Sequence, residues 1–207
     1  MQDDETGSWW QQITGEAIFG SSKGQRLKLV PHDELSFSLW KQEHPRGRVL
    51  LPDDTKPWKQ FSEDWEEHTA KLPVDAVLNP DTRMSARTQV VGIKVGNVAK
   101  AYPLSTIREQ NPILDHIGNT PIIIVLAEDK KSIRAFDRRI DGQELEFFAR
   151  SGSQSLRLVD AQTGSEWDFT GKSFSGPHAG HQLNKIHSLK DYWFDWKAYN
   201  PETEVYR

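Results

Sequence analysis

Short apolar runs separated by turn residues dominate the second half of the chain. Residues 90–95 and 98–102 flank Gly96 and Asn97, a dipeptide that tolerates positive φ and predicts a β-hairpin. Residues 122–126 are continuously apolar, which predicts a strand buried on both faces. The pattern therefore predicts a mainly β (α+β) fold, an antiparallel barrel or sandwich meander with a few short helices.

A second hairpin is predicted where Asp-Gly at 141–142 joins residues 133–140 to residues 143–149, because Asp-Gly is a strong signal for a type I′ turn. With this turn as the register, Arg138 lies on an apolar face. A guanidinium in that position requires a carboxylate or an aromatic ring as a partner. We expect Asp160 to provide the carboxylate.

Three segments have helical spacing. Residues 35–43 predict a short helix that ends before Pro45, since the residue preceding a proline is disfavoured in helices. Spaced aromatic residues predict an amphipathic helix near 59–70. Ser188 fits an N-cap, and an aromatic stripe over 189–199 follows it. We therefore expect a helix at the C-terminal end as well.

The two ends of the chain resemble each other. Matched residues near the start are Thr6, Gly7, Ser8, Trp10, Thr14, Gly15, Gly20, Gly24, Leu27, Trp40, Lys41, Pro45 and Val49. Their counterparts are Thr163, Gly164, Ser165, Trp167, Thr170, Gly171, Gly176, Gly180, Leu183, Trp196, Lys197, Pro201 and Val205. We therefore predict a partial, C-terminal part of a repeat copy at 1–52, a connector carrying a helix at 53–87, and a complete copy at 88–207.

The partial copy carries much apolar surface for its size. Trp9, Trp10, Ile13, Ile18 and Phe19 lie among Thr and Gly residues, as in short strands and turns. A half-unit cannot bury this surface alone. We expect residues 1–52 to pack on the complete copy or to mediate self-association with another chain.

Composition and charge exclude several classes of function. The net charge of −4, the pI near 6.0 and the scattered Lys and Arg residues give no attraction for nucleic acid. The absence of Cys excludes disulfides, thiolate catalysis and Cys-ligated zinc within this chain. No stretch approaches the roughly 20 apolar residues of a membrane span, and the first residues lack the features of a secretory signal. The sequence does not indicate a cellular location.

Ordered motifs along most of the chain support a family resemblance. They are Val91-Gly92-Ile93, Ala99-Lys100-Ala101-Tyr102-Pro103-Leu104, Phe136-Asp137-Arg138, Asp141-Gly142, Asp160, Thr163-Gly164-Ser165, Trp167, Gly176, Gly180, Trp193-Phe194, Trp196, Pro201, Thr203 and Val205. With these motifs in this order, the chain resembles the mainly bacterial and archaeal family called domain of unknown function 3179. The resemblance implies that this chain is the C-terminal part of a tandem-repeat member, and it implies export for family members.

The chain departs from the family at the positions with chemical potential. In members with the most complete pattern, a Trp-His-Glu segment follows the Tyr-Pro-Leu stretch and a Cys-Pro-x-Cys segment follows the apolar strand. Here the corresponding places are residues 109–111, Glu-Gln-Asn, and residues 127–129, Ala-Glu-Asp. The groups capable of metal or redox chemistry are therefore absent from these places.

Seven residues are candidates for ligand binding, namely Lys100, Tyr102, Arg138, Asp160, Thr163, Ser165 and Trp167. The hydroxyl groups and the indole could line a pocket, and the two cations could hold an anion. The simpler interpretation is a turn in which Asp160, Thr163 and Ser165 bond their own backbone while Trp167 fills the core. No nucleophile motif or phosphate-binding loop is present, and we assign no catalytic residue.

His178, His181 and His187 are weak candidates for a metal site because imidazole is a common zinc ligand. They lie in a Gly-rich segment whose pattern fixes no direction for their side chains. We therefore expect structural or surface histidines, and no metal or other cofactor.

Three functional hypotheses remain. The first is a non-catalytic structural or interaction module, based on the loss of the His and Cys positions. The second is half of a metal- or redox-dependent enzyme whose reactive groups lie in a missing upstream copy. The third is a small-molecule binding domain that uses Arg138 and Trp167.

Overall fold

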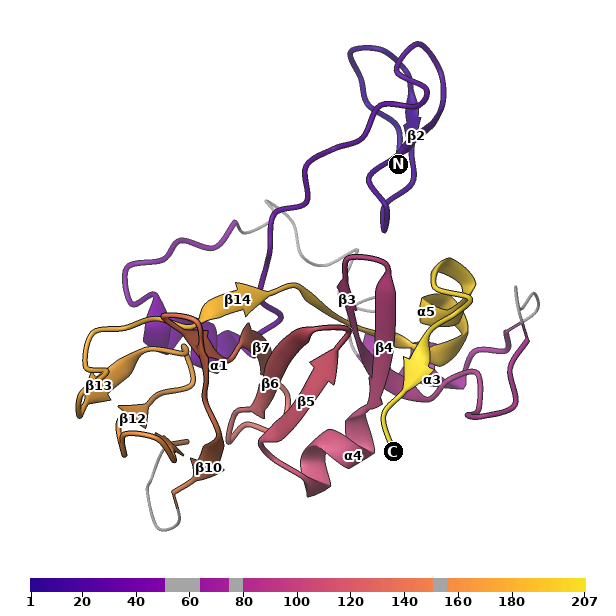
Figure 1. Cartoon of the computed structure of the whole chain (residues 1–207). Coiled ribbons are helices and arrows are strands. Elements are labelled where there is room, and N and C mark those ends of the chain that lie inside the picture. Colours follow the sequence, from indigo (N-terminus) through magenta and orange to yellow (C-terminus); the bar gives the residue numbers. More distant parts are fainter. Residues whose placement is uncertain (51–63, 75–79, 151–155) are drawn as a thin grey trace. The chain divides into compact units, whose positions relative to one another are not determined.

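The computed structural model describes residues 1–50, 64–74, 80–150 and 156–207 (Figure 1). The chain divides into two compact units, Met1–His32 and Asp33–Arg207. Each unit has hydrogen bonds within itself and buried residues of its own. None of the helices within the described ranges has the length and hydropathy needed to cross a lipid bilayer.

The small unit is a tight two-stranded structure. Its strands are β1 (Trp9–Trp10) and β2 (Ala17–Phe19), which pair antiparallel, and Gln2 adds a bridge to Trp9. Ser8 and Ala17 are buried, whereas Phe19 is 66% exposed. The short strands and turns predicted for this segment are confirmed, and the unit leaves much of its apolar surface uncovered.

The first sheet of the larger unit has the order β15-β3-β4-β16. Its strands are β3 (Gln89–Val95), β4 (Val98–Pro103), β15 (Ser188–Tyr192) and β16 (Glu204–Val205). Gly96 has a φ of 58°, and Val95 pairs with Val98 across the turn, which confirms the first predicted hairpin. The last strand, β16, pairs parallel to β4.

The second sheet has the order β14-β7-β6-β5. Its strands are β5 (Ile113–Ile117), β6 (Thr120–Leu126), β7 (Ile133–Asp137) and β14 (Asn184–Ile186). Residues 121–126 of β6 are all buried. Side chains alternate between the faces of a strand, so both faces of β6 are covered, as its apolar run predicted.

The third sheet has the order β10-β11-β12-β13. Its strands are β10 (Phe147–Ala149), β11 (Leu158–Asp160), β12 (Glu166–Trp167) and β13 (Ser173–Ser175). A separate ribbon joins β8 (Arg139–Ile140) to β9 (Gln143–Glu144). Asp141 and Gly142 both have positive φ, 50° and 81°, which confirms the type I′ turn.

Four short helices occur among the described residues. They are α1 (Phe37–Glu43), α3 (Trp65–Lys71), α4 (Leu104–Glu109) and α5 (Trp193–Tyr199). The helix predicted over 35–43 is confirmed as α1, whose N-cap Ser36 accepts a hydrogen bond from the backbone of Leu39. The helix predicted near 59–70 falls partly outside the described residues, and its described part is α3.

The predicted cap at Ser188 is wrong. Residues Ser188–Tyr192 form β15, which pairs along its whole length with β3, and the helix begins only at Trp193. An aromatic stripe with helical spacing was compatible with either structure. Backbone pairing with a strand about 100 residues earlier decided the outcome, because five successive residues of the segment pair in register with β3.

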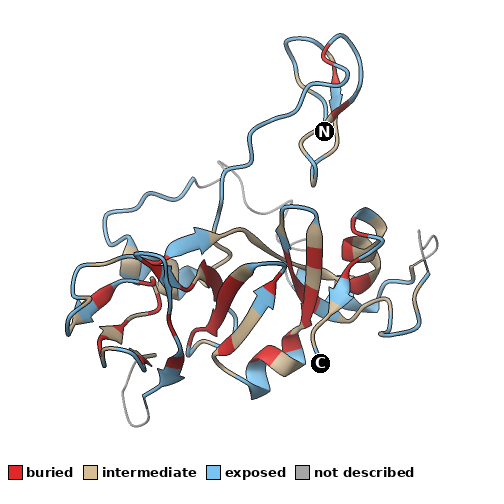
Figure 2. Cartoon of the chain, in the orientation of Figure 1, coloured by how far each residue is buried: buried red, intermediate tan, exposed pale blue. Residues whose placement is uncertain are grey.

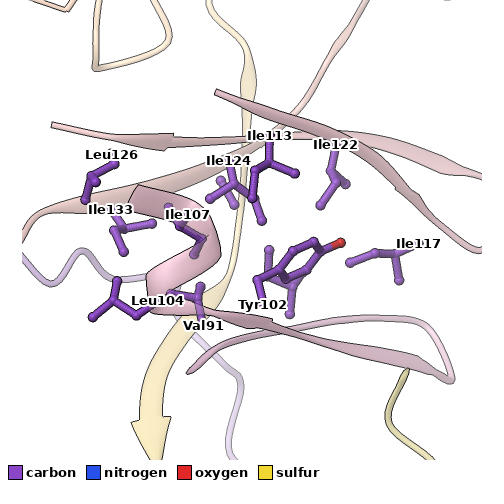
Figure 3. Packing of buried hydrophobic residues seen from close by; sticks show 12 residues of the cluster. Val91, Tyr102, Leu104, Ile107, Ile113, Ile117, Ile122, Ile124, Leu126 and Ile133 are labelled. Atoms are coloured by element: carbon purple, nitrogen blue, oxygen red, sulfur yellow. The ribbon is translucent and has the colours of Figure 1, made fainter. Parts of the chain in front are cut away.

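Three apolar clusters stabilise the larger unit. Figure 2 marks its buried residues in red. The first packs α4 between the sheets, and Figure 3 shows Ile107 and the ring of Tyr102 among isoleucines of β5 and β6. The second surrounds Trp167, and the third lies between α5 and the β3–β4 hairpin. The fold is mainly β, with several antiparallel sheets, and the described strands do not close into a barrel.

Candidate functional site

The best-connected group of candidate residues lies around the carboxylate of Asp160, at the end of β11. The Asp160 side chain is fully buried. Its Oδ2 accepts the indole N–H of Trp167 at 2.9 Å, and its Oδ1 accepts the backbone N–H and hydroxyl of Thr163 at 2.6 and 2.8 Å. Ser165 Oγ lies 2.6 Å from Thr163 Oγ1. The ring of Trp167 packs edge-on against Phe147.

The small unit contains the same arrangement. Trp10 Nε1 donates to Asp3 Oδ2 at 2.7 Å, and the backbone N–H of Thr6 donates to Asp3 Oδ1 at 2.6 Å. The Thr6 and Ser8 hydroxyl groups lie 2.6 Å apart. The two bonds to the Asp3 carboxylate correspond in donor and acceptor to those of Asp160, and the hydroxyl pair is equally close.

A glycine closes the turn in both units. A Cβ atom on Gly176 would lie 2.7 Å from Ser165 Oγ, and one on Gly20 would lie 2.6 Å from Ser8 Oγ. Both glycines have positive φ, 80° and 96°. A side chain at either position would collide with the serine.

The hydrogen bonds around Asp160 keep its carboxylate charged. Burial opposes ionisation, but the indole of Trp167 and both donors of Thr163 outweigh it and lower the pKa of Asp160. In the small unit, Trp10 and Thr6 lower the pKa of Asp3 to about 2. A carboxylate whose lone pairs are already occupied by internal donors is a structural anchor and a poor general base.

Arg138 is buried, but its partner is not Asp160. Its guanidinium contacts Glu144 at 2.6 Å and Glu146 at 3.2 Å, and it also donates to the carbonyl oxygen of Leu145 at 2.8 Å. The predicted pairing with Asp160 is therefore wrong. The turn at 141–142 folds β9 back beside Arg138, so that the nearest carboxylates are local in sequence.

Lys100 and Tyr102 form a second group, held together by Asp115 of β5. Lys100 Nζ lies 2.6 Å from Asp115 Oδ2, to which the Tyr102 hydroxyl also donates at 2.8 Å. Glu204 lies 3.9 Å from the same ammonium. Burial, followed by the bond to Asp115, raises the pKa of Tyr102. The ammonium is neutralised by its own neighbours, which disfavours an anion-binding role.

The comparison with protein families is decisive for identity. The profile described as Protein of unknown function (DUF3179) matches residues 1–203. The chain belongs to the DUF3179 family. No curated protein and no solved structure shows significant similarity to it. The DUF3179 match covers both the small and the larger unit.

Residues 109–111 and 127–129 of this DUF3179 chain are neighbours in the fold. Asn111, just after α4, donates from its side-chain amide to the carbonyl oxygen of Leu126 at 2.8 Å and accepts the N–H of Leu126 at 2.9 Å. Leu126 ends β6 and directly precedes Ala127. In this chain an amide clamp, without Cys or His, occupies the junction.

The three candidate histidines of this DUF3179 chain do not form one group. The rings of His178 and His181 lie 5.3 Å apart, and His181 Nδ1 lies 3.0 Å from the carbonyl oxygen of His178. His187 lies between β14 and β15. Within the described ranges, no three His, Cys, Asp or Glu side chains have an arrangement suited to a metal ion.

Sequence reasoning missed a partly buried pair of acids at the start of α5. The carboxyl group of Asp191 has one oxygen that is buried without a hydrogen-bond partner, while the other accepts the N–H of Tyr192 at 2.7 Å. Burial, and then the charges of Asp195 and Glu34, raise the pKa of Asp191 to about 7. Two acids spaced four residues apart among aromatic residues were the available signal.

This pKa predicts a pH-dependent stability. The folded state favours protonated Asp191, whereas the unfolded chain ionises near pH 4, so stability is lost as pH rises from about 4 to about 7. Asp191→Asn is expected to remove this loss. Because Asp191 keeps some solvent access, we expect a gain on the order of 1 kcal/mol at pH 8 and little change at pH 4.

Urea unfolding of both proteins at pH 4, 6 and 8 measures this difference. Asp168→Asn is a suitable control, because all three hydrogen bonds that Asp168 accepts go to Oδ1, which the amide oxygen of asparagine can replace. The control substitution should change stability little at all three pH values. An Asp191→Asn protein less stable than the wild type at pH 8 would contradict the prediction.

Proposed function

We propose that this DUF3179 chain is a non-catalytic structural and interaction module. The observation that carries the proposal is the closed hydrogen-bond network around Asp160, in which Thr163, Ser165 and Trp167 are bonded to one another and to the chain. A binding or catalytic site needs polar groups that are free to meet a ligand. The groups in this cluster are used for folding.

The recurrence of this network supports the same proposal. We infer that Asp3, Thr6, Ser8 and Trp10 belong to a partial copy of the unit that contains Asp160, because the bonds to the two carboxylates have the same donors. Two copies of a fold need the same turn. A ligand site would not need to be built twice with the same internal contacts.

The small-molecule alternative receives less support. Arg138 and Trp167 are 3% and 0% exposed. The terminal nitrogens of Arg138 contact Glu144 and the carbonyl oxygen of Leu145, and its Nε is buried without a partner among the described residues. The indole of Trp167 bonds Asp160. Binding a ligand through them would require breaking buried bonds. The cationic candidates Lys100 and Arg138 are each matched by carboxylates.

Thr163→Val tests the proposed structural role. The isosteric change removes a donor to Asp160 and an acceptor for Ser165, so we expect the free energy of unfolding to fall by about 1–2 kcal/mol. The measurement is urea unfolding, accompanied by thermal shifts with zinc chloride and with phosphate. Thr6→Val, in the matching network, is the companion variant.

The structural role predicts lower stability and an unchanged response to both additives. If Thr163→Val were as stable as the wild type, but zinc chloride or phosphate raised the Tm of the wild type and not that of the variant, the result would instead identify a ligand site. Such a result would overturn the proposed function.

One observation favours a second candidate, namely half of a metal- or redox-dependent enzyme. The places that carry Trp-His-Glu and Cys-Pro-x-Cys in the complete family pattern meet at the Asn111–Leu126 contact. A copy with those residues would therefore bring His and Cys together. Elemental analysis of a DUF3179 protein that contains such a copy beside this one would test it, and a metal-free protein would count against it.

A further inference from the structure

Helices α1 and α5 of the larger unit have the same local design. Each has seven residues, starts with an aromatic residue and has a Trp three positions later. The C-cap residues have matching dihedral angles, with φ and ψ of −123° and 65° at His44 and −129° and 68° at Asn200. Each C-cap N–H donates to the carbonyl oxygen of the Trp, at 2.8 Å for Trp40 and 3.0 Å for Trp196.

The aromatic face of α5 is buried on a platform of small residues. Trp193 and Trp196 are only 1% and 4% exposed. A Cβ atom on Gly92 of β3 would lie 2.2 Å from Cε3 of Trp196, so the indole rests directly on the glycine. Ala99 and Ala101 of β4 belong to the same cluster. A helix of this design therefore packs on a β-hairpin rich in Gly and Ala.

Within the described residues, the aromatic face of α1 is covered only in part. A Cβ atom on Gly47 would lie 2.6 Å from Cη2 of Trp40, and the ring centroids of Trp40 and His44 lie 5.7 Å apart. None of the residues of α1 is buried, and Phe37 is 61% exposed. Phe37 and Trp40 stack with ring centroids 5.7 Å apart. Leu39, in contrast, packs against the cluster around Trp167. A cavity of about 440 Å³ opens beside α1, and its described lining residues are Asp33, Leu35, Phe37, Trp40 and His44.

The charges around the two helices give a second comparison. In α5, Lys197 follows the Trp and lies 3.6 Å from Asp81, which precedes the β3–β4 hairpin. Lys41 follows the Trp of α1 and is exposed, with no ion pair to any residue of the described ranges. Arg46 and Arg48 are also exposed. Lys41 therefore adds an exposed positive charge to the helix that carries the aromatic face, which favours a partner with carboxylates.

We propose that the aromatic face of α1, formed by Phe37 and Trp40, docks an antiparallel β-hairpin of another polypeptide segment. The hairpin presents Gly and Ala to the indole and a carboxylate to Lys41. This inference rests on the proposed role as an interaction module. The β3–β4 hairpin of the same chain is covered by α5 and is not the occupant. An aromatic residue on a small-residue platform is a typical centre of a protein interface.

A fluorescent peptide of residues 80–103, held as a hairpin by a lactam across its strands, is the probe. This peptide contains Asp81, Gly92 and the two alanines of the platform. Fluorescence anisotropy with the full chain is expected to show saturable binding. Trp40→Ala in the chain, or Gly92→Val in the peptide, should weaken binding at least tenfold. Phe148→Ala, at a side chain 61% exposed on β10, is the matched control and should leave binding unchanged.

Exchanging the charges of Lys41 and Asp81 tests the proposed ion pair separately from the contact with the indole of Trp40. Lys41→Glu is expected to weaken binding severalfold, and a peptide with Asp81→Lys should restore it on that variant. Lys41 is exposed, so this change leaves the fold intact. Absence of saturable binding, equal binding of the Gly92→Val peptide, or full binding to Trp40→Ala would overturn the docking inference. The stability result for Thr163→Val is independent of these outcomes and tests the module itself.

Discussion

Asp160→Asn is expected to lower the free energy of unfolding by about 3 kcal/mol, because the new amide cannot accept all the donors that the carboxylate accepts. One carboxylate oxygen receives the N–H of Thr163 and the other receives the indole N–H of Trp167. Asparagine has a single acceptor oxygen. Its NH₂ group must face one of these buried donors, whichever way the amide is turned.

Urea unfolding monitored by tryptophan fluorescence gives this free energy directly. Asp3→Asn alters the matching network on a side chain with solvent access, and we expect a smaller loss from it. A variant as stable as the wild type would show that the network around Asp160 contributes nothing to the fold.

The same network makes an acid-dependent contribution to stability. The pKa of Asp160 is lowered in the folded state, so its contribution is complete above the unfolded value of about 4 and is lost as pH falls through the folded pKa. Asp160→Asn should therefore differ most from the wild type at neutral pH, and the difference should shrink at low pH.

Arg134→Ala is expected to cost about 3–5 kcal/mol and to release α1 from the sheet. Arg134 lies on β7 and is 4% exposed. Its guanidinium bonds Asp33 at 2.8 Å and both carboxylate oxygens of Glu43 at 2.7 Å, while its plane lies over Phe169. Removing it leaves two partly buried carboxylates without their main counter-charge.

Unfolding measurements should be combined with hydrogen exchange of the α1 amides. We expect faster exchange in α1 for Arg134→Ala and an intermediate effect for Arg134→Lys, which keeps the charge but cannot form the forked bond. Arg139→Ala is the control, because Arg139 pairs with Asp137 on the surface and should cost no more than about 1 kcal/mol. Equal effects of Arg134→Ala and Arg139→Ala would refute the prediction.

The contacts of α1 bear on the prediction that residues 1–52 pack on the complete copy or on another chain. Residues 33–43 belong to the larger unit and contact its second sheet, through Arg134 and through the bond from the Ser36 N–H to Ser132 Oγ at 2.8 Å. The division between the two compact units falls at His32 and Asp33, within the segment predicted as one partial copy. For the first 32 residues, packing on the complete copy or on another chain stays a prediction.

Among the candidate residues, sequence reasoning correctly grouped those that are close in the chain. Thr163, Ser165 and Trp167 meet Asp160 because a turn of a few residues brings them together. It failed for Arg138, whose register pointed to an apolar face but not to the carboxylates of Glu144 and Glu146. A hairpin register fixes which backbone atoms pair, whereas the reach of a long side chain depends on how the ribbon twists.

The sequence by itself determined the turns, the short strands and the helix at 37–43, because these depend on neighbouring residues. Gly96-Asn97 and Asp141-Gly142 specify their hairpins through positive φ, and the apolar run of β6 specifies burial on both faces. Only the tertiary structure decided that Ser188–Tyr192 is a strand beside β3 and that Arg134 binds Asp33, 101 residues away. Such contacts depend on which distant segments the core brings together, and no local pattern encodes that choice.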